Sequence, residues 1–334
     1  MCETITVPLY QVALRRISDP FNILSKIHNK QSYSSGEPIP EHIIRSSDGC
    51  YPAYALLDKL SFSTPISFSD KEAISRGLRW KCIEDNKKKI WVYVYDYKYT
   101  YKGLPYSTRI TINQDRPFKQ DPLVTVNPSH FPNIQYLMDS LFSLYEPEQI
   151  LEGRIVRLDC SVDILRPFQQ ELIGVTFHKK KIKEKHTEGG KITGLYIGKS
   201  RRGRWQNLLL VYDKQKESNL DFFVTRYEVS DATKLLLKDL SKICKHTPFS
   251  FIRRNELKII EPVNKTKKFY DFKIRCEDKG FYLTKSTLNK DRNFIKMYSG
   301  YFSLTPLEPT LDTIFKESMA TYFNIASPKT AGVK

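Results

Sequence analysis

Long apolar runs are missing from this sequence of 334 residues. No stretch approaches the roughly 20 apolar residues that cross a bilayer, and the first residues lack the pattern of a signal peptide. We therefore expect an intracellular, cytoplasmic protein without a membrane partner. The sequence also contains no internal repeat of fixed period and no low-complexity tract, so a repeat architecture is not expected.

Cysteine and histidine are scarce and scattered, with six residues of each. The cysteines form no C-x-x-C pair, and no histidine lies beside them at the spacing of metal ligands. This distribution predicts free, mostly buried thiols. The six are Cys2, Cys50, Cys82, Cys160, Cys244 and Cys276.

Acidic residues are outnumbered, because 37 Asp and Glu stand against 54 Lys and Arg, which gives a formal net charge of +17. A surplus of this size predicts a polyanionic partner, and nucleic acid is the first candidate. Hydrophobic residues make up 40% of the chain, enough for the core of one large domain or two ordinary ones.

The hydrophobic periodicity predicts an α+β fold of mostly antiparallel sheets with flanking helices. Strands are expected at residues 60–68, 90–101, 108–113, 155–164, 192–197, 206–212 and 223–229. A hairpin turn is expected at residues 103–105. Helices are expected over residues 70–76, after Pro132, and after the N-cap residues Asp231 and Thr310.

These elements divide the chain into three parts. Residues 1–57 form an appended segment, with a short alternating strand at residues 6–13 and a helix after Asp19. Residues 58–240 form the main domain, and residues 241–334 form a C-terminal region that is rich in lysine and aromatic residues.

One predicted strand has an entirely aromatic face. Aromatic side chains occupy every second position from residue 91 to residue 101, so they point to the same side. Such a face could stack on single-stranded DNA. Packing in the core is favoured instead, because the alternate positions turn polar at Asp96 and Lys98 and leave the aromatic face the more apolar one.

Polar residues also alternate along the strands that carry the candidate chemistry. In one strand Arg157, Asp159, Ser161 and Asp163 share a face, and in another Arg226, Glu228 and Ser230 do so. Tyr212 shares a face with Leu210 in a third strand. If the three strands are neighbours, carboxylates, arginines and a tyrosine share one surface. An ordinary antiparallel sheet with a polar outer face, in which Arg226 and Glu228 form an ion pair, explains the same pattern.

This combination suits strand transfer at a phosphodiester. A tyrosine hydroxyl is a weak nucleophile unless a base or a cation assists it, because its usual pKa is about 10. Carboxylates are ligands for Mg²⁺ or Mn²⁺, and arginine and lysine contact phosphate oxygens. Attack by the tyrosine would cut the strand and retain a phosphotyrosine ester.

The order of the motifs resembles the trans-acting replication initiation factor family, which serves rolling-circle plasmids, some phages and related integrative elements. The resemblance covers about residues 58–240, beginning at KLSF (59–62). It rests on VRLDCSVD (156–163), YIG (196–198), VYDKQKE (211–217) and TRYEV (225–229).

The resemblance implies a role for several residues. Tyr212 would be the nicking nucleophile, Asp159, Asp163 and Glu228 would bind the divalent cation, and Lys214 and Arg226 would contact phosphate. It also implies double-stranded origin DNA and single-stranded DNA as partners, bound partly through the C-terminal region, and a host helicase and a homodimer.

The chain departs from the family pattern at two positions. Leu210 stands where many relatives carry a basic residue, and Ser230 stands where they carry an acidic one. A metal site short of one ligand would be weaker, completed by water, or inactive. No two histidines flank a single apolar residue, so the nicking enzymes that bind metal through a His-hydrophobe-His clamp are disfavoured.

Several basic residues, in addition to Arg157, are candidates for contact with DNA. A loop of lysines between two strands could follow a phosphate backbone, and an arginine-rich loop with a tryptophan could hold an unpaired base. A solvated charged loop is the alternative in both places. These candidates are Lys179, Lys180, Lys181, Arg201, Arg202, Arg204 and Trp205.

Three functions remain open on the sequence. The first is a rolling-circle initiator that nicks and rejoins one DNA strand at an origin. The second is a conjugative relaxase with the same chemistry. The third is a DNA-binding regulator without activity, which the serine at position 230 favours.

Overall fold

The computed structural model describes residues 44–45, 52–85, 88–115, 121–168, 171, 175–177, 182–188, 191–197, 208–220, 223–231, 235–259 and 302–325. The strand expected at residues 6–13, the helix after Asp19 and both basic loops lie outside these residues. No helix in the described part of the chain is long and apolar enough to cross a membrane.

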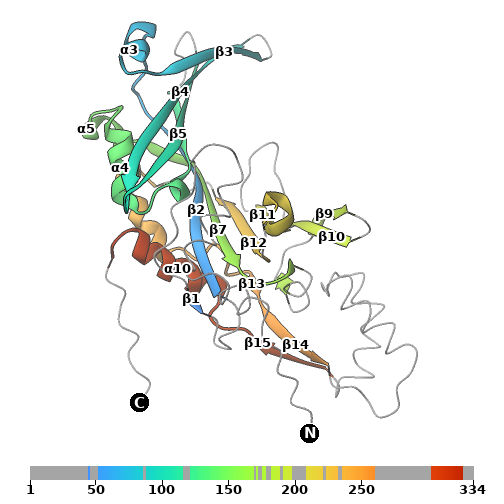
Figure 1. Cartoon of the computed structure of the whole chain (residues 1–334). Helices are drawn as coiled ribbons and strands as arrows, with labels where there is room; N and C mark the ends of the chain where they lie inside the picture. The colour runs from blue at the N-terminus through green and yellow to red at the C-terminus, as the bar shows by residue number, and fades with distance from the viewer. Residues whose placement is uncertain are drawn as a thin grey trace, which may run out of the picture.

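Eleven of the described strands form one large antiparallel sheet, and with the helices this confirms the α+β class (Figure 1). Its path is β3-β4-β5-β6-β2-β7-β12-β11-β10-β9, and β1 pairs with β2. The bounds are β1 Ile44–Arg45, β2 Pro52–Ser63, β3 Arg79–Asp85, β4 Lys88–Tyr101, β5 Leu104–Asp115, β6 Leu123–Val126, β7 Arg154–Ile164, β9 Ile182–Glu188, β10 Lys191–Ile197, β11 Leu208–Asp213 and β12 Thr225–Asp231.

Short helices and two small strand pairs accompany the large sheet. β8 (Thr176–Phe177) pairs with β13 (Ile252–Arg253), and β14 (Asn255–Ile259) pairs with β15 (Phe302–Pro306). The helices are α3 Asp70–Ser75, η1 Pro128–His130, α4 Ile134–Phe142, α5 Pro147–Ile150, α7 Lys214–Ser218, η2 Leu237–Lys245 and α10 Leu311–Tyr322.

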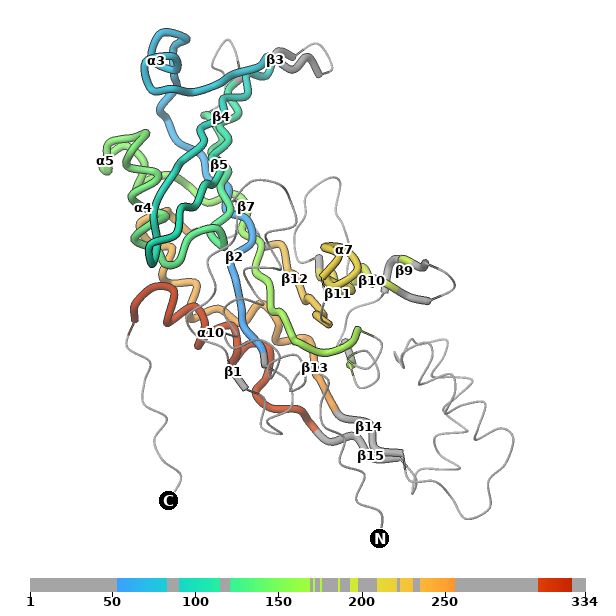
Figure 2. Tube along the Cα trace, viewed as in Figure 1, coloured from blue at the N-terminus to red at the C-terminus, as the bar shows by residue number. Residues whose placement is uncertain are grey.

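The C-terminal helix belongs to the same core as the first long strand. Thr310 caps α10 by accepting from the backbone N–H of Thr313, as the sequence predicts. Buried side chains of α10 pack into the core of the large sheet, and the Ala55 N–H of β2 donates to Ser318 Oγ over 3.0 Å. Figure 2 shows α10 and β2 close together although they come from opposite ends of the chain. The boundary expected after residue 57 falls inside β2, because this strand pairs with β7 from Ala53 onward.

Three other boundaries differ from the sequence prediction. β2 ends at Ser63, so residues 64–68 continue as an irregular segment. The helix expected directly after Asp231 begins later, as the 3₁₀ helix η2, because Asp231 itself still pairs with Leu158 in the sheet. The hairpin turn consists of Lys102 and Gly103, both with positive φ, which suits the tight turn between twisted strands.

The aromatic face of β4 packs in the core, as favoured above. Tyr93 is fully buried, and Tyr99 is almost so. The ring of Tyr99 stacks on Tyr106 at 5.4 Å and on Phe131 at 5.7 Å, and Tyr136 of α4 packs against it. These contacts leave Tyr99 no open face for a nucleic-acid base.

The described cysteines are free thiols, as predicted. Cys160 is buried, Cys244 is half-buried and Cys82 is exposed. Burial among the described cysteines is therefore less uniform than expected, because Cys82 lies on β3, an edge strand of the sheet.

A buried ionic network fixes β12 from the helix-covered face of the sheet. The Glu171 carboxylate accepts from Tyr227 Oη over 2.8 Å and from both Nε and Nη2 of Arg254, the latter over 3.1 Å. Burial alone would raise the pKa of Glu171, but the guanidinium groups of Arg254 and Arg166 and these hydrogen bonds lower it to about 2. The network thus joins β12 to the segment that leads into β14.

Substitution of Glu171 by Gln is expected to lower the free energy of unfolding by about 3 kcal/mol, because the positive charge of Arg254 is then left buried without its counter-charge. Urea denaturation followed by circular dichroism measures the change. Glu148→Gln on the exposed face of α5 is the matched control and should leave the midpoint unchanged. Equal midpoints for the two variants would contradict the prediction.

Candidate active site

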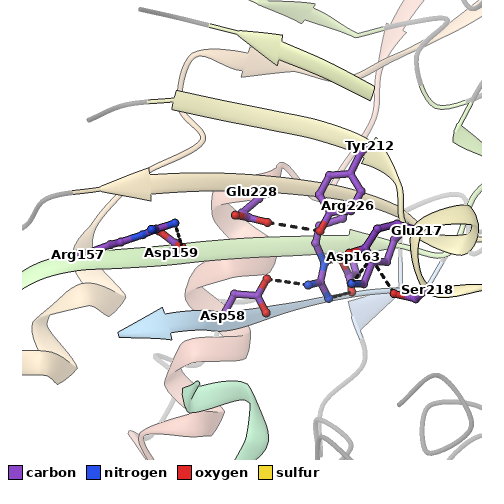
Figure 3. Close-up of polar contacts among 10 residues, drawn as sticks. Asp58, Arg157, Asp159, Asp163, Tyr212, Glu217, Ser218, Arg226 and Glu228 are labelled. Carbon is purple, nitrogen blue, oxygen red and sulfur yellow. Dashed lines mark hydrogen bonds and ion pairs between the residues drawn. The ribbon is translucent and has the colours of Figure 1, made fainter. Parts of the chain in front are cut away.

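The strand register brings the predicted site residues to one face of the sheet. Tyr212 of β11 lies opposite Arg226 of β12, which lies opposite Asp163 of β7. In the next row Glu228 lies opposite Ser161, and residues that face one another across antiparallel strands point to the same side. Figure 3 shows Tyr212, Glu228, Asp163 and Asp159 on this shared face, as the alternation predicts.

Arg226 is the ionic centre of this face. Its Nε and Nη2 donate to the two oxygens of Asp163 over 2.7 and 2.8 Å, and its Nη1 donates to Asp58 over 2.7 Å. The residue is only 2% exposed. The expected contact between Arg226 and phosphate is therefore replaced by contacts with two aspartates, because the guanidinium is buried beneath the surface.

Asp58 was not among the site residues predicted from the sequence. This residue lies at a bulge in β2, where the register with β7 shifts between Leu57 and Lys59. The bulge interrupts the alternation, so periodicity alone does not place the Asp58 side chain on the same face as Asp163. The motif order does not include it either, since it precedes the first matched segment by one residue.

Tyr212 and Glu228 form the pair best suited to transfer a proton. The Tyr212 hydroxyl donates to Glu228 Oε2 over 3.4 Å. Burial raises the pKa of Glu228 to about 7, and the neighbouring Asp58 adds to this effect while Arg226 opposes it. Burial also raises the pKa of Tyr212 above its usual value, although Arg226 acts in the opposite direction. Glu228 is therefore suited to accept a proton near neutral pH.

The short helix after Tyr212 explains the motif VYDKQKE. Asp213 caps α7 by accepting from the Lys216 N–H over 3.2 Å, so the chain turns immediately after the tyrosine. Lys214 and Glu217 then lie one turn apart and pair over 2.5 Å. The ammonium of Lys214 lies 5.9 Å from the centre of the Tyr212 ring, which places a cation beside the tyrosine.

Asp159 and Asp163 do not fit a single metal ion in this arrangement. They are four residues apart on β7, and a strand rises about 3.3 Å per residue, so their Cα atoms are about 13 Å apart. Asp159 also accepts two hydrogen bonds from Arg157, over 2.9 and 2.6 Å. Among the described residues, no three His, Cys, Asp or Glu side chains are grouped closely enough to hold a metal ion.

Asp58 and Glu228 are neighbouring carboxylates, which makes either one a candidate ligand for a cation. Asp58 is close enough to Glu228 to raise its pKa, so a positive charge between them would relieve the repulsion. The buried hydroxyl of Ser161, opposite Glu228, has no hydrogen-bond partner among the described residues. Mg²⁺ commonly binds one or two carboxylates and completes its shell with water and substrate phosphate.

An open cavity of about 500 Å³ gives access to the pair. It lies over β9, β10 and β11, beside α7. Its lining includes Tyr212, Glu228, His186, Tyr196 and Lys216. The tyrosine, although half-buried, is thus accessible to a substrate from outside.

Comparison with known proteins adds no relative, since no family model and no curated protein matches the chain. The resemblance to the replication initiation factors therefore rests on the motif order. The basic loops lie outside the described residues, so the predicted roles of Lys179, Lys180, Lys181, Arg201, Arg202, Arg204 and Trp205 stay predictions.

Replacement of Arg226 by Met should lower the free energy of unfolding by about 3–5 kcal/mol, because Asp163 is left buried and unpaired. The double variant Arg226→Met/Asp163→Leu should recover part of that loss, since it removes the buried charge as well. Urea unfolding curves of both variants measure the difference. Arg109→Met, at an exposed arginine of β5, serves as the control. An Arg226→Met protein as stable as this control would refute the ionic role.

Proposed function

We propose that this protein nicks and rejoins one DNA strand at an origin of rolling-circle replication, with Tyr212 as the nucleophile. The observation that carries the proposal is the hydrogen bond from the Tyr212 hydroxyl to Glu228 in an open cavity. The order of the motifs and the net charge of +17 support DNA as the substrate.

In the proposed reaction the Tyr212 oxygen attacks the phosphorus of one phosphodiester. A bond forms between the tyrosine oxygen and phosphorus, and the bond from phosphorus to one sugar oxygen breaks. The tyrosine proton passes to Glu228, which can return it to the departing sugar oxygen. No water is consumed, so the phosphotyrosine ester retains the bond energy and a later sugar hydroxyl can reverse the step and rejoin the strand.

The raised pKa values support transfer of the proton during attack rather than before it. A half-buried tyrosine with a raised pKa does not ionise by itself at neutral pH. Glu228, with a pKa of about 7, is present partly as carboxylate at that pH and can accept the proton as the new bond forms. Arg226 holds Asp163 and Asp58 in place and does not contact the substrate in this proposal.

A divalent cation, Mg²⁺ or Mn²⁺, is part of the proposal. Asp58, together with water and the substrate phosphate, would hold it, so that Glu228 remains free to accept the proton, and it would stabilise the negative charge that develops on the phosphate oxygens. Lys214 beside the Tyr212 ring, Lys216 in the wall of the cavity and Arg157, whose side chain is 33% exposed, are described cations that would contact phosphate.

The partners remain proposals of the same kind. Double-stranded origin DNA, single-stranded DNA, a host helicase and a second copy of the chain follow from the family resemblance. A conjugative relaxase would use the same chemistry on a transfer origin, so origin and transfer DNA must be compared directly as substrates.

Tyr212→Phe should abolish a covalent protein–DNA adduct, because the variant loses the attacking oxygen. Wild type and variant are incubated with Mg²⁺ or Mn²⁺ and oligonucleotides that cover the origin of the replicon, and a denaturing gel measures the adduct. Tyr95→Phe, on β4 and away from the cavity, is the matched control. An adduct that persists in Tyr212→Phe would assign the chemistry to another residue. Binding without any adduct in wild type would favour the inactive regulator.

Glu228→Gln should slow nicking by about 100- to 10,000-fold, the range typical of a general base, while DNA binding persists. Single-turnover cleavage and filter binding measure the two effects separately. Glu152→Gln, at an exposed residue outside the cavity, should match wild type in both measurements. Cleavage at the wild-type rate by Glu228→Gln would exclude the carboxylate as proton acceptor.

A further inference from the structure

The cavity beside Tyr212 has a floor that lacks a side chain. Gly194 of β10 lies between His186 of β9 and Tyr212 of β11, and all three are in register. A Cβ atom at Gly194 would lie 3.5 Å from the Cβ of Tyr212 and 3.6 Å from that of His186. A side chain longer than alanine would therefore fill the gap between them, and glycine keeps it open.

Two aromatic rings form the wall of the cavity at the end opposite Glu228. The ring of Tyr196 lies 4.9 Å from that of His186, at an interplanar angle of 46°. Tyr196 pairs with Leu210, the neighbour of Glu228 on the next strand. The cavity is thus aromatic at one end, and at the other it offers the Tyr212 hydroxyl and Glu228.

We infer that this cavity binds one unpaired nucleotide next to the scissile phosphate, with its base against Tyr196 and His186. The inference rests on the proposed function and extends it. Tyr196 and Glu228 are two strands apart, which is about 10 Å at the usual strand spacing. A base against Tyr196 thus leaves its own phosphate within reach of the Tyr212–Glu228 pair. The volume of about 500 Å³ is within the range of ligand pockets.

The geometry favours an unpaired base over a base pair. A base that lies against an aromatic ring inside a cavity must leave the stack of its own duplex, since neighbouring pairs cover both of its faces. Contact with an aromatic ring is available to every base, because each has a flat face, so this cavity would select strand state rather than sequence. The protein would then cleave where the DNA is already open.

The test uses single-stranded oligonucleotides that cover the origin of the replicon, with an abasic nucleotide placed in turn on each side of the cleaved bond. In wild type, one abasic position should raise KM by about 5- to 150-fold, the equivalent of losing about 1–3 kcal/mol of base stacking. In Tyr196→Ala, KM should already be raised for the natural oligonucleotide, and the same abasic position should add nothing. Tyr196→Phe should behave as wild type.

Two more variants separate the cavity from general effects. Gly194→Val should raise KM by filling the floor, although it leaves every polar side chain of the site in place. Trp80→Ala, at a tryptophan that is 45% exposed on β3, removes an aromatic side chain outside the cavity and should leave KM unchanged. An abasic penalty that is equal in wild type and Tyr196→Ala would overturn the inference while leaving the proposed nicking reaction intact.

A separate experiment distinguishes failure of the proposed function from failure of the nucleotide site. If no oligonucleotide forms an adduct, the nicking proposal fails, and a binding measurement then tests whether the cavity still holds an unpaired base. Oligonucleotides with 2-aminopurine at successive positions are added to Tyr212→Phe protein, which binds without cleaving. Quenching at one position that disappears in Tyr212→Phe/Tyr196→Ala supports the subsite, and quenching that is equal in both proteins overturns it.

Discussion

The candidate site depends on the ion pairs that the guanidinium of Arg226 forms with two aspartates. Arg226 lies on β12 but contacts Asp163 on β7 and Asp58 on β2, so one side chain joins three strands. A one-residue slip of either strand pair would move its partners to the opposite face and leave buried charges unpaired. The register of β12 on β7 is therefore held by a contact whose loss would be costly.

The same contact sets the electrostatics around the tyrosine. Arg226 faces two carboxylates, so the three groups together carry a net negative charge beside Glu228. Burial raises the pKa of Glu228, and Asp58 adds to the rise. A fully exposed glutamate would be ionised at neutral pH and a poor proton acceptor for tyrosine. The Arg226 pairing thus links the architecture of the sheet to a carboxylate whose pKa is raised to about 7.

Periodicity predicted the parts of the site that depend on local pattern. Asp159, Asp163 and Glu228 alternate with apolar residues, and each is on the expected face because β7 and β12 pair without a register shift. Asp58 was not predicted because a bulge breaks the period of two in β2. The buried ion pairs of Arg226 were not predicted because burial depends on which other elements cover the face. The boundary expected at residue 57 lies inside β2 for a similar reason: β2 pairs with β7, which comes about a hundred residues later in the sequence.

β12 is held from both sides of the sheet, and this bears on how strand rejoining could work. Arg226 fixes one face through Asp163 and Asp58, while Tyr227, the next residue, fixes the other through Glu171 and Arg254. A strand anchored in this way keeps Glu228 at a constant position relative to Tyr212. In the proposed reaction, rejoining would require the phosphotyrosine to persist while one DNA end leaves and another arrives. A rigid protein site would meet that requirement, because the incoming hydroxyl would then find the same geometry in which the first bond was cut.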